Sequence, residues 1–260
     1  LPGVPSELRA MWSWVREELA AAGVLGDAVS RVVRVFGVGE LQVGAVVDAV
    51  PRASLDVAIN VGGGEVAVRL RHARTAAAQT EADTLVDALV TELPVFSTDG
   101  RTIDEMVADG LRARGATVAV AESCTGGLVG GRLTALPGSS DYFLGGVVAY
   151  ANDVKVAALG VEPRLLDRHG AVSAEVATAM AEGARHATGA TYGLSTTGVA
   201  GPDGGTAEKP VGLVFVGCAG PSGAHAVRQR FPGDRQSVRE WAVARALHLL
   251  RETFAGEDGR

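Results

Sequence analysis

The chain has 260 residues with 24 Lys+Arg and 30 Asp+Glu, a formal net charge of −6, and it is 47% hydrophobic. This composition is typical of a globular protein with one large domain or two smaller ones. Two cysteines exclude a disulfide scaffold, and no Cys or His spacing indicates a zinc site. The acidic balance argues against nucleic-acid binding, no apolar run approaches roughly 18 residues, and the first residues do not show the basic-then-apolar pattern of a leader. We expect a cytoplasmic protein with no membrane partner.

The first 28 residues indicate a loop followed by one helix. Pro5 and Ser6 are typical of a helix start, and an apolar stripe follows at Leu8, Met11 and Trp12. The chain does not begin with Met. We therefore interpret residues 1–28 as a remnant of a preceding domain.

Residues 29–98 predict a small α+β domain. Strands are expected at 32–36, 56–61 and 66–70, with helices at 41–50 and 80–93, in the order β-α-β-β-α. This unit carries no cluster of acid, base and nucleophile, and its Gly37-Val38-Gly39 indicates a strand-to-helix turn. The chemistry is therefore expected elsewhere.

Residues 99–260 predict a larger domain of the α/β class, with a layered α/β/α arrangement. Buried strands alternate with helices, which is typical of that architecture. The strands are expected at 116–121, 146–150, 192–197 and 211–216, and the helices at 102–114, 128–136, 173–188 and 238–254. Residues 94–100 form the expected linker before this domain.

Polar residues follow the first of these strands, in the segment 119–127 (AVAESCTGG). Its glycines allow a tight turn, and a helix that starts there directs unpaired N–H groups back at the turn. Such amides suit an anion or a developing oxyanion beside Ser123. A simple helix cap explains the same pattern equally well.

Two further clusters follow other strands. In residues 150–155 (YANDVK), Lys155 could deprotonate a serine if burial lowers its pKa, with Tyr150 as a relay; a surface lysine is the simpler interpretation. The Gly-rich segment 196–205 could bring amides close to a phosphate or sugar, or be a surface loop. Arg235 could add a guanidinium, and Glu122 could orient the site, although either could instead serve a helix start.

Several motifs together resemble the CinA C-terminal domain family, which includes the nicotinamide-nucleotide amidohydrolases of PncC type. They occur in family order between about residues 102 and 254. The motifs are 121–127 (AESCTGG), 137–140 (PGSS), 145–150 (GGVVAY), 170–173 (GAVS), 197–205 (TGVAGPDGG), 208–212 (EKPVG) and 233–235 (GDR).

The resemblance implies hydrolysis of the carboxamide of nicotinamide mononucleotide to nicotinate mononucleotide and ammonia, in pyridine-nucleotide (NAD) salvage. It implies Ser123 as nucleophile, Lys155 as base and Tyr150 as partner of the lysine, with no metal or cofactor. A homodimer is expected. The substrate-binding residues expected are Glu122, Cys124, Thr125, Gly126, Thr197, Gly198, Gly201 and Arg235.

The earlier residues resemble parts of full-length CinA proteins. Residues 1–7 resemble the end of a molybdopterin-binding-like domain, which carries an ADP-ribose pyrophosphatase activity in the family, and residues 31–93 resemble a KH-like connecting domain. Most of the first domain is expected to be missing, so that activity is unsupported. RNA binding is not expected, because no GXXG loop lies between the helices.

Alternatives remain open from the sequence. An amidase using Cys124 is possible because Cys is the better nucleophile, although no His is placed to identify its partner. A penicillin-recognising enzyme needs Lys three residues after its Ser, where this chain has Gly126. A short-chain dehydrogenase needs a lysine one residue closer to Tyr150 than Lys155. A non-catalytic pyridine-nucleotide or competence-related module is the alternative from another class.

Overall fold

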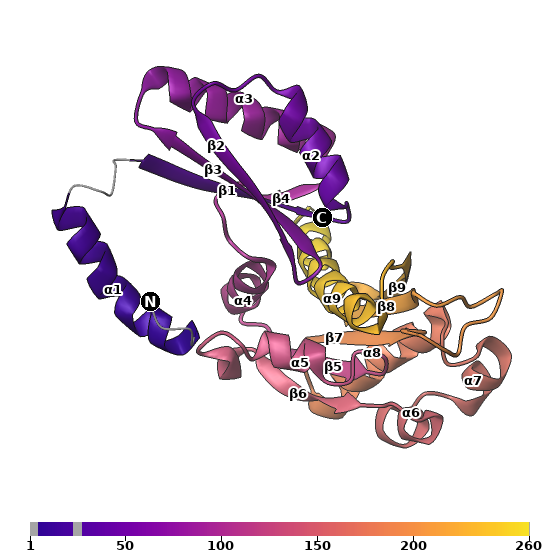
Figure 1. Cartoon of the computed structure of the whole chain (residues 1–260). Coiled ribbons are helices and arrows are strands. Elements are labelled where there is room, and N and C mark those ends of the chain that lie inside the picture. Colours follow the sequence, from indigo (N-terminus) through magenta and orange to yellow (C-terminus); the bar gives the residue numbers. More distant parts are fainter. Residues whose placement is uncertain (1–4, 23–27, 260) are drawn as a thin grey trace.

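The computed structural model describes residues 5–22 and 28–259 (Figure 1). The loop expected at residues 1–4 lies outside this part. Helix α1 (Pro5–Ala21) precedes two β-sheets, each with its own hydrophobic core. Met11 and Trp12, two residues of the apolar stripe expected on α1, are exposed.

The first sheet is antiparallel, with strand order β2-β3-β1-β4. Valine and leucine side chains of β1 and β3 pack against α2 and α3 to form its core. The elements are β1 (Ala28–Phe36), α2 (Glu40–Ala49), β2 (Leu55–Gly62), β3 (Glu65–Ala73), α3 (Ala76–Glu92) and β4 (Val95–Ser97). The β-α-β-β-α order predicted from the sequence is therefore observed, with one short strand added.

The second sheet has strand order β6-β5-β7-β8-β9. Strands β6, β5 and β7 are parallel, whereas β8 and β9 are antiparallel to their neighbours. Its strands are β5 (Val118–Glu122), β6 (Phe143–Val148), β7 (Tyr192–Gly198), β8 (Leu213–Gly220) and β9 (Gly223–Arg230). The helices around it are α4 (Ile103–Ala113), α5 (Leu128–Leu133), the 3₁₀ turn η1 (Ser139–Asp141), α6 (Asn152–Leu159), α7 (Pro163–His169), α8 (Ala174–Thr188) and α9 (Arg235–Asp258).

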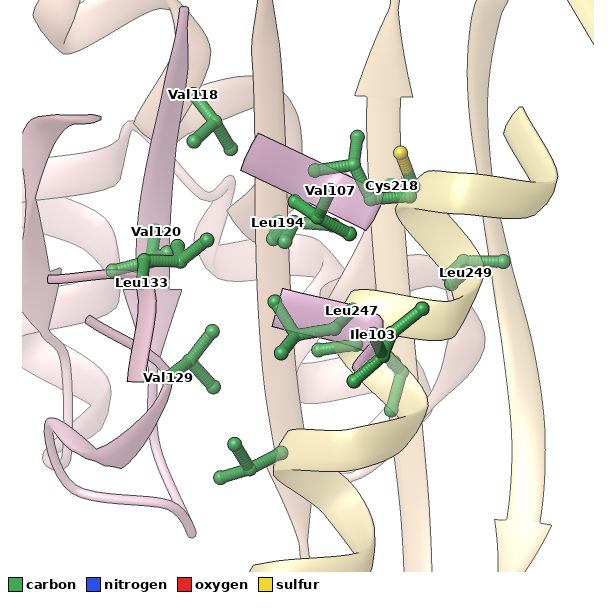
Figure 2. Packing of buried hydrophobic residues seen from close by; sticks show 14 of the residues in the cluster. Ile103, Val107, Val118, Val120, Val129, Leu133, Leu194, Cys218, Leu247 and Leu249 are labelled. Atoms are coloured by element: carbon green, nitrogen blue, oxygen red, sulfur yellow. The ribbon is translucent and has the colours of Figure 1, made fainter. Parts of the chain in front are cut away.

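Strand β5 is buried along its whole length and serves both faces of the sheet. Val118 and Val120 enter a core with α4, α5 and α9, as Figure 2 shows, while Ala119 and Ala121 enter a second core with α8. The alternation follows from the two-residue period of a strand. The predicted layered α/β arrangement is thus present in this part of the chain.

Helix α8 packs closely on the sheet through small residues. A methyl group added at Gly193 would lie 2.0 Å from the carbonyl oxygen of Ala181, which no neighbour could relieve without moving backbone. The Ser195 hydroxyl donates to the carbonyl of Ala177 at 2.5 Å. This close contact fixes the position of β7, whose end contributes to the site described below.

The two sheets are joined through α9. His248 of α9 stacks on Phe36 of β1, with ring centroids 3.8 Å apart, and its Nε2 lies 3.2 Å from Glu65 Oε1 of β3. Arg132 of α5 lies 3.5 Å from the same carboxylate and donates to the carbonyl of Gly63. Buried polar contacts of this kind require partners in fixed positions, so they set the orientation of the two sheets.

Some predicted elements differ from those observed. Strand β6 ends at Val148 rather than at 150, so Tyr150 lies in the following turn. Strand β9 was not predicted, because it is a polar edge strand whose side chains give little hydrophobic signal. Strand β4 falls within the predicted linker, and its Phe96 is buried against His248.

Candidate active site

The C-terminal ends of β5, β6 and β7 meet at one edge of the second sheet, because these strands are parallel neighbours. The chain runs from β5 to β6 on one side and then crosses to β7 on the other. Such a reversal leaves a crevice beyond the strand ends, where α/β sheets bind ligands. A cavity of about 210 Å³ lies there, lined by Ser123, Cys124, Tyr150, Asn152, Lys155, Ala171, Val172, Thr197, Gly198, Ala200 and Arg235.

Ser123 is the first residue after β5, and its backbone N–H donates to the carbonyl of Thr196 at 2.9 Å. The Lys155 side chain is 1% exposed, and its Nζ lies 3.4 Å from Ser123 Oγ. Nζ also donates to the carbonyls of Ala149 and Tyr150, at 2.9 and 3.1 Å. Burial lowers the pKa of Lys155, because desolvation disfavours the ammonium form. The pair therefore has the geometry of a nucleophile and its base.

The Tyr150 side chain is 60% exposed and lines the same cavity. Its hydroxyl accepts a hydrogen bond from Arg235 Nη2 at 3.1 Å, whereas the atom of Tyr150 that contacts Lys155 is the backbone carbonyl oxygen. We expected the Tyr150 hydroxyl to pair with the lysine amine, and the structure does not place these two groups together. Because β6 ends two residues early, the turn presents carbonyls to Lys155.

Glu122, expected to bind substrate, instead serves the start of α5. Its carboxylate is 1% exposed and accepts from the amides of Gly127, Val129 and Gly130 at 2.8–3.0 Å. The Thr125 hydroxyl donates to it at 2.6 Å. Its position follows the two-residue alternation that turns Val118 and Val120 toward α5. The carboxylate satisfies amides that a substrate anion would otherwise use.

Cys124 lines the cavity, but its side chain is only 5% exposed. Burial raises the pKa of its thiol to about 12, so it is a thiol and not a thiolate near neutral pH. The backbone amides of Cys124 and Thr125 make no hydrogen bond to another residue within 5–22 and 28–259. Of these two residues Cys124 lines the cavity, so its amide is the one that a ligand oxygen there could reach.

Thr125 and Gly126, expected to bind substrate, do not line the cavity. The Thr125 hydroxyl is fully buried between Glu122 and the hydroxyl of Thr196, with both contacts at 2.6 Å. Gly126 takes a φ of +60°, a conformation that favours glycine, and so forms the turn. Both residues shape the loop that carries Ser123.

Thr197, Gly198 and Arg235 line the cavity as expected, and Gly201 does not. The Thr197 hydroxyl donates to the carbonyl of Ala171 at 2.8 Å, which ties β7 to the opposite wall. Gly201 contributes its carbonyl, which accepts from Arg235 Nη1 at 2.9 Å. Arg235 is thus held between Gly201 and the hydroxyl of Tyr150.

Four lining residues were missed as site residues: Asn152, Ala171, Val172 and Ala200. All lie within or beside family motifs noted in the sequence, so the motifs were the available signal.

Within the described residues, no three His, Cys, Asp or Glu side chains are grouped to hold a metal ion. None of the described helices is long and apolar enough to cross a membrane.

Known proteins similar to this chain carry CinA-type names. A "CinA-like protein" of Koribacter versatilis is 42% identical over 265 residues, covering 97% of this chain and 63% of that protein. One from Synechocystis sp. is 45% identical over 264 residues, covering 96% and 62%. The chain therefore spans less than two thirds of the length of these curated relatives.

Solved structures of similar proteins match about 60% of this chain. The competence/damage inducible protein CihA from Agrobacterium tumefaciens is 39% identical with a TM-score of 0.55, covering 60% of this chain and 97% of that one. The competence damage-inducible protein A (ComA) from Klebsiella pneumoniae is 33% identical with a TM-score of 0.57, covering 59% and 95%. The family model described as the CinA C-terminal domain matches residues 100–254, more than half of the chain. This chain belongs to the CinA family.

Proposed function

We propose that this protein hydrolyses the carboxamide of nicotinamide mononucleotide, giving nicotinate mononucleotide and ammonia. The observation that carries the proposal is the 3.4 Å approach of Lys155 Nζ to Ser123 Oγ, with the lysine buried. A buried lysine of lowered pKa is neutral more often than an exposed one, so it can accept the serine proton.

The first half of the reaction forms an acyl-enzyme. Lys155 takes the proton of Ser123 as Oγ attacks the amide carbon. The negative charge that develops on the carbonyl oxygen is bound by the backbone amide of Cys124, a residue that lines the cavity. The C–N bond then breaks, and the amide nitrogen leaves as ammonia with the proton held by Lys155.

The second half of the reaction releases nicotinate mononucleotide from Ser123. Lys155, neutral again, takes a proton from a water molecule that attacks the acyl carbon. The tetrahedral intermediate collapses, and Ser123 recovers its proton from Lys155. Since Cys124 is buried with a raised pKa, the serine is the better supported nucleophile.

Substrate size suggests how the nucleotide would be held. The cavity of about 210 Å³ is below the range of about 300–1,000 Å³ usual for small-molecule sites, so it suits the nicotinamide end alone. Arg235 is exposed on the cavity wall and would bind the phosphate. Tyr150 would hold Arg235 in place through its hydroxyl.

Some wider expectations belong with this proposal: a cytoplasmic role in pyridine-nucleotide salvage, a homodimer, no cofactor, and a KH-like identity for the first sheet. The chain covers only 62–63% of its curated relatives, so we propose these properties for the part of the protein that this sequence represents.

The test is ammonia release from nicotinamide mononucleotide by the purified chain and by Ser123→Ala and Cys124→Ala. We expect Ser123→Ala to lower kcat by a factor on the order of 10³ or more, and Cys124→Ala to stay near the parent rate. Release that survives Ser123→Ala but not Cys124→Ala would move the nucleophile to the cysteine. Tight binding without release by the parent chain would support a nucleotide-binding module instead.

A further inference from the structure

A second cavity lies between the two sheets, away from Ser123. Its volume is about 310 Å³, within the range usual for small-molecule sites. Three segments line it: the end of β1 with the turn into α2, the end of β9, and one face of α9. The lining residues are Phe36, Gly37, Val38, Gly39, Gln42, Gln229, Arg230, Phe231, Pro232, Trp241 and Arg245.

Aromatic rings form much of the wall. Phe231 stacks on Trp241 with centroids 5.9 Å apart and planes at 15°. The ring of Phe36, on β1, has its centroid 6.1 Å from that of Trp241. Trp241 and Phe36 are only partly buried, so their rings are not fully used by packing. Surfaces of this kind bind planar rings, because stacked and edge contacts between aromatic groups are favourable.

The polar lining of the cavity is cationic. Arg230 and Arg245 line it, and none of the acidic residues that the structure describes does. Within the described chain, the exposed guanidinium of Arg230 makes no hydrogen bond or ion pair. Arg245 is 8% exposed and binds Glu252 through both terminal nitrogens, but its buried Nε–H has no partner. Arg230 therefore supplies the unmatched charge.

The turn into α2 adds a second favourable feature. Gly39 is the N-cap of this ten-residue helix and has no side chain to cap it; its own N–H donates to Gln42 Oε1 at 3.2 Å. Glu40 begins the helix but does not line the cavity. The partial positive charge of a helix start favours anions, and here it acts beside Arg230.

We propose that this cavity binds a small organic anion with a planar ring, of about the size of a mononucleotide. The ring would lie against Trp241 and Phe36, and the anionic group would be bound by Arg230. The site is separate from the proposed reaction at Ser123 and does not depend on it.

Ligand bound here would contact both sheets at once. Trp241 and Arg245 lie on α9, the helix that begins with Arg235 at the first cavity, while Phe36 is the last residue of β1 in the first sheet. A ligand that binds only the folded state would therefore stabilise the junction of the two sheets. It also gives a route by which the occupant could affect the position of Arg235.

The experiment uses tryptophan fluorescence. The chain has three tryptophans, Trp12, Trp14 and Trp241, so Trp12→Phe with Trp14→Phe leaves Trp241 as the single reporter. Trp12 and Trp14 are exposed on α1, at 48% and 58%, so the parent fold is expected to persist. Adenosine 5′-monophosphate is the probe, compared with adenosine and with ribose 5-phosphate, which each lack one half of the recognised chemistry.

We expect a saturable change of Trp241 emission with adenosine 5′-monophosphate, and binding about tenfold weaker for either half-ligand. Arg230→Gln should weaken binding about tenfold. Arg228→Gln removes the same charge two residues away on β9, outside the lining, and should leave binding unchanged. No saturable change, equal weakening by both arginine variants, or equally tight binding of adenosine would overturn the proposal.

Discussion

The side-chain nitrogen of Lys155 lies 3.4 Å from the hydroxyl oxygen of Ser123, and its other hydrogen-bond partners are two backbone carbonyls. Within the described residues no carboxylate pairs with this lysine. Carbonyl oxygens hold the amine without the full charge that would stabilise an ammonium. Burial therefore dominates, and the pKa of Lys155 falls.

The pH dependence of the proposed reaction follows from this shift. Only the neutral amine accepts a proton, so kcat/KM should rise with pH and level off below the pKa of about 10.4 of a free lysine. Lys155→Arg, which stays protonated, should be inactive throughout. The measurement is ammonia release from pH 6 upward.

Lys209 provides the control, since it is the other lysine of the chain and its Nζ donates to the carbonyl of His169. Lys209→Arg should leave the pH profile where it is. An unchanged profile in Lys155→Arg would remove Lys155 from the mechanism.

Arg235 is expected to recognise the phosphate. Arg235→Gln should raise KM for nicotinamide mononucleotide about tenfold, because a charge-assisted contact is lost. KM for nicotinamide riboside, which has no phosphate, should hardly change. Steady-state kinetics with both substrates measures this, and an equal loss for the two would contradict phosphate binding.

Tyr150→Phe tests whether the tyrosine acts by holding Arg235 in position, since it removes only the hydroxyl that accepts from Arg235. We expect a smaller rise of KM than in Arg235→Gln, again confined to the phosphorylated substrate. A loss of kcat with both substrates would instead assign the tyrosine hydroxyl to proton transfer.

Glu122→Gln should destabilise the protein by about 2–4 kcal/mol. The new amide group would place a donor against backbone N–H donors in a buried site, leaving groups unpaired. Urea unfolding with an unchanged m-value is the measurement. The matched change Glu105→Gln, at the capping box of α4, should cost about 1 kcal/mol or less. Equal effects would argue against a special role for Glu122.

Gly193→Ala should destabilise by about 3 kcal/mol or more, because its methyl group would overlap the Ala181 carbonyl and force α8 from the sheet. Gly131→Ala is the matched control: it lies inside α5, and an added methyl meets no atom within 4 Å. That variant should be more stable by up to about 1 kcal/mol. Thermal unfolding of both variants decides, and a neutral Gly193→Ala would show that α8 can shift freely.

The sequence alone determined that the chain has two units, each with a sheet. It also determined that Ser123 and Lys155 each follow the end of a strand. A nearly continuous apolar run is enough to predict β5, and every one of its residues is buried. The motif after β5 and the lysine after β6 each follow a strand end, and parallel strands end at the same edge. The polar edge strand β9 could not be predicted in this way, because its partner β8 lies on one side only.

The tertiary structure decided how individual polar groups are used. Glu122 beside a serine suggests substrate binding, yet three amides at the start of α5 already donate to its carboxylate. Tyr150 near Lys155 suggests a shared proton, yet its hydroxyl meets Arg235, which is 85 residues away in the chain. Hydrogen bonds act over about 3 Å and depend on direction, so they are fixed by the packing of distant segments rather than by spacing along the sequence.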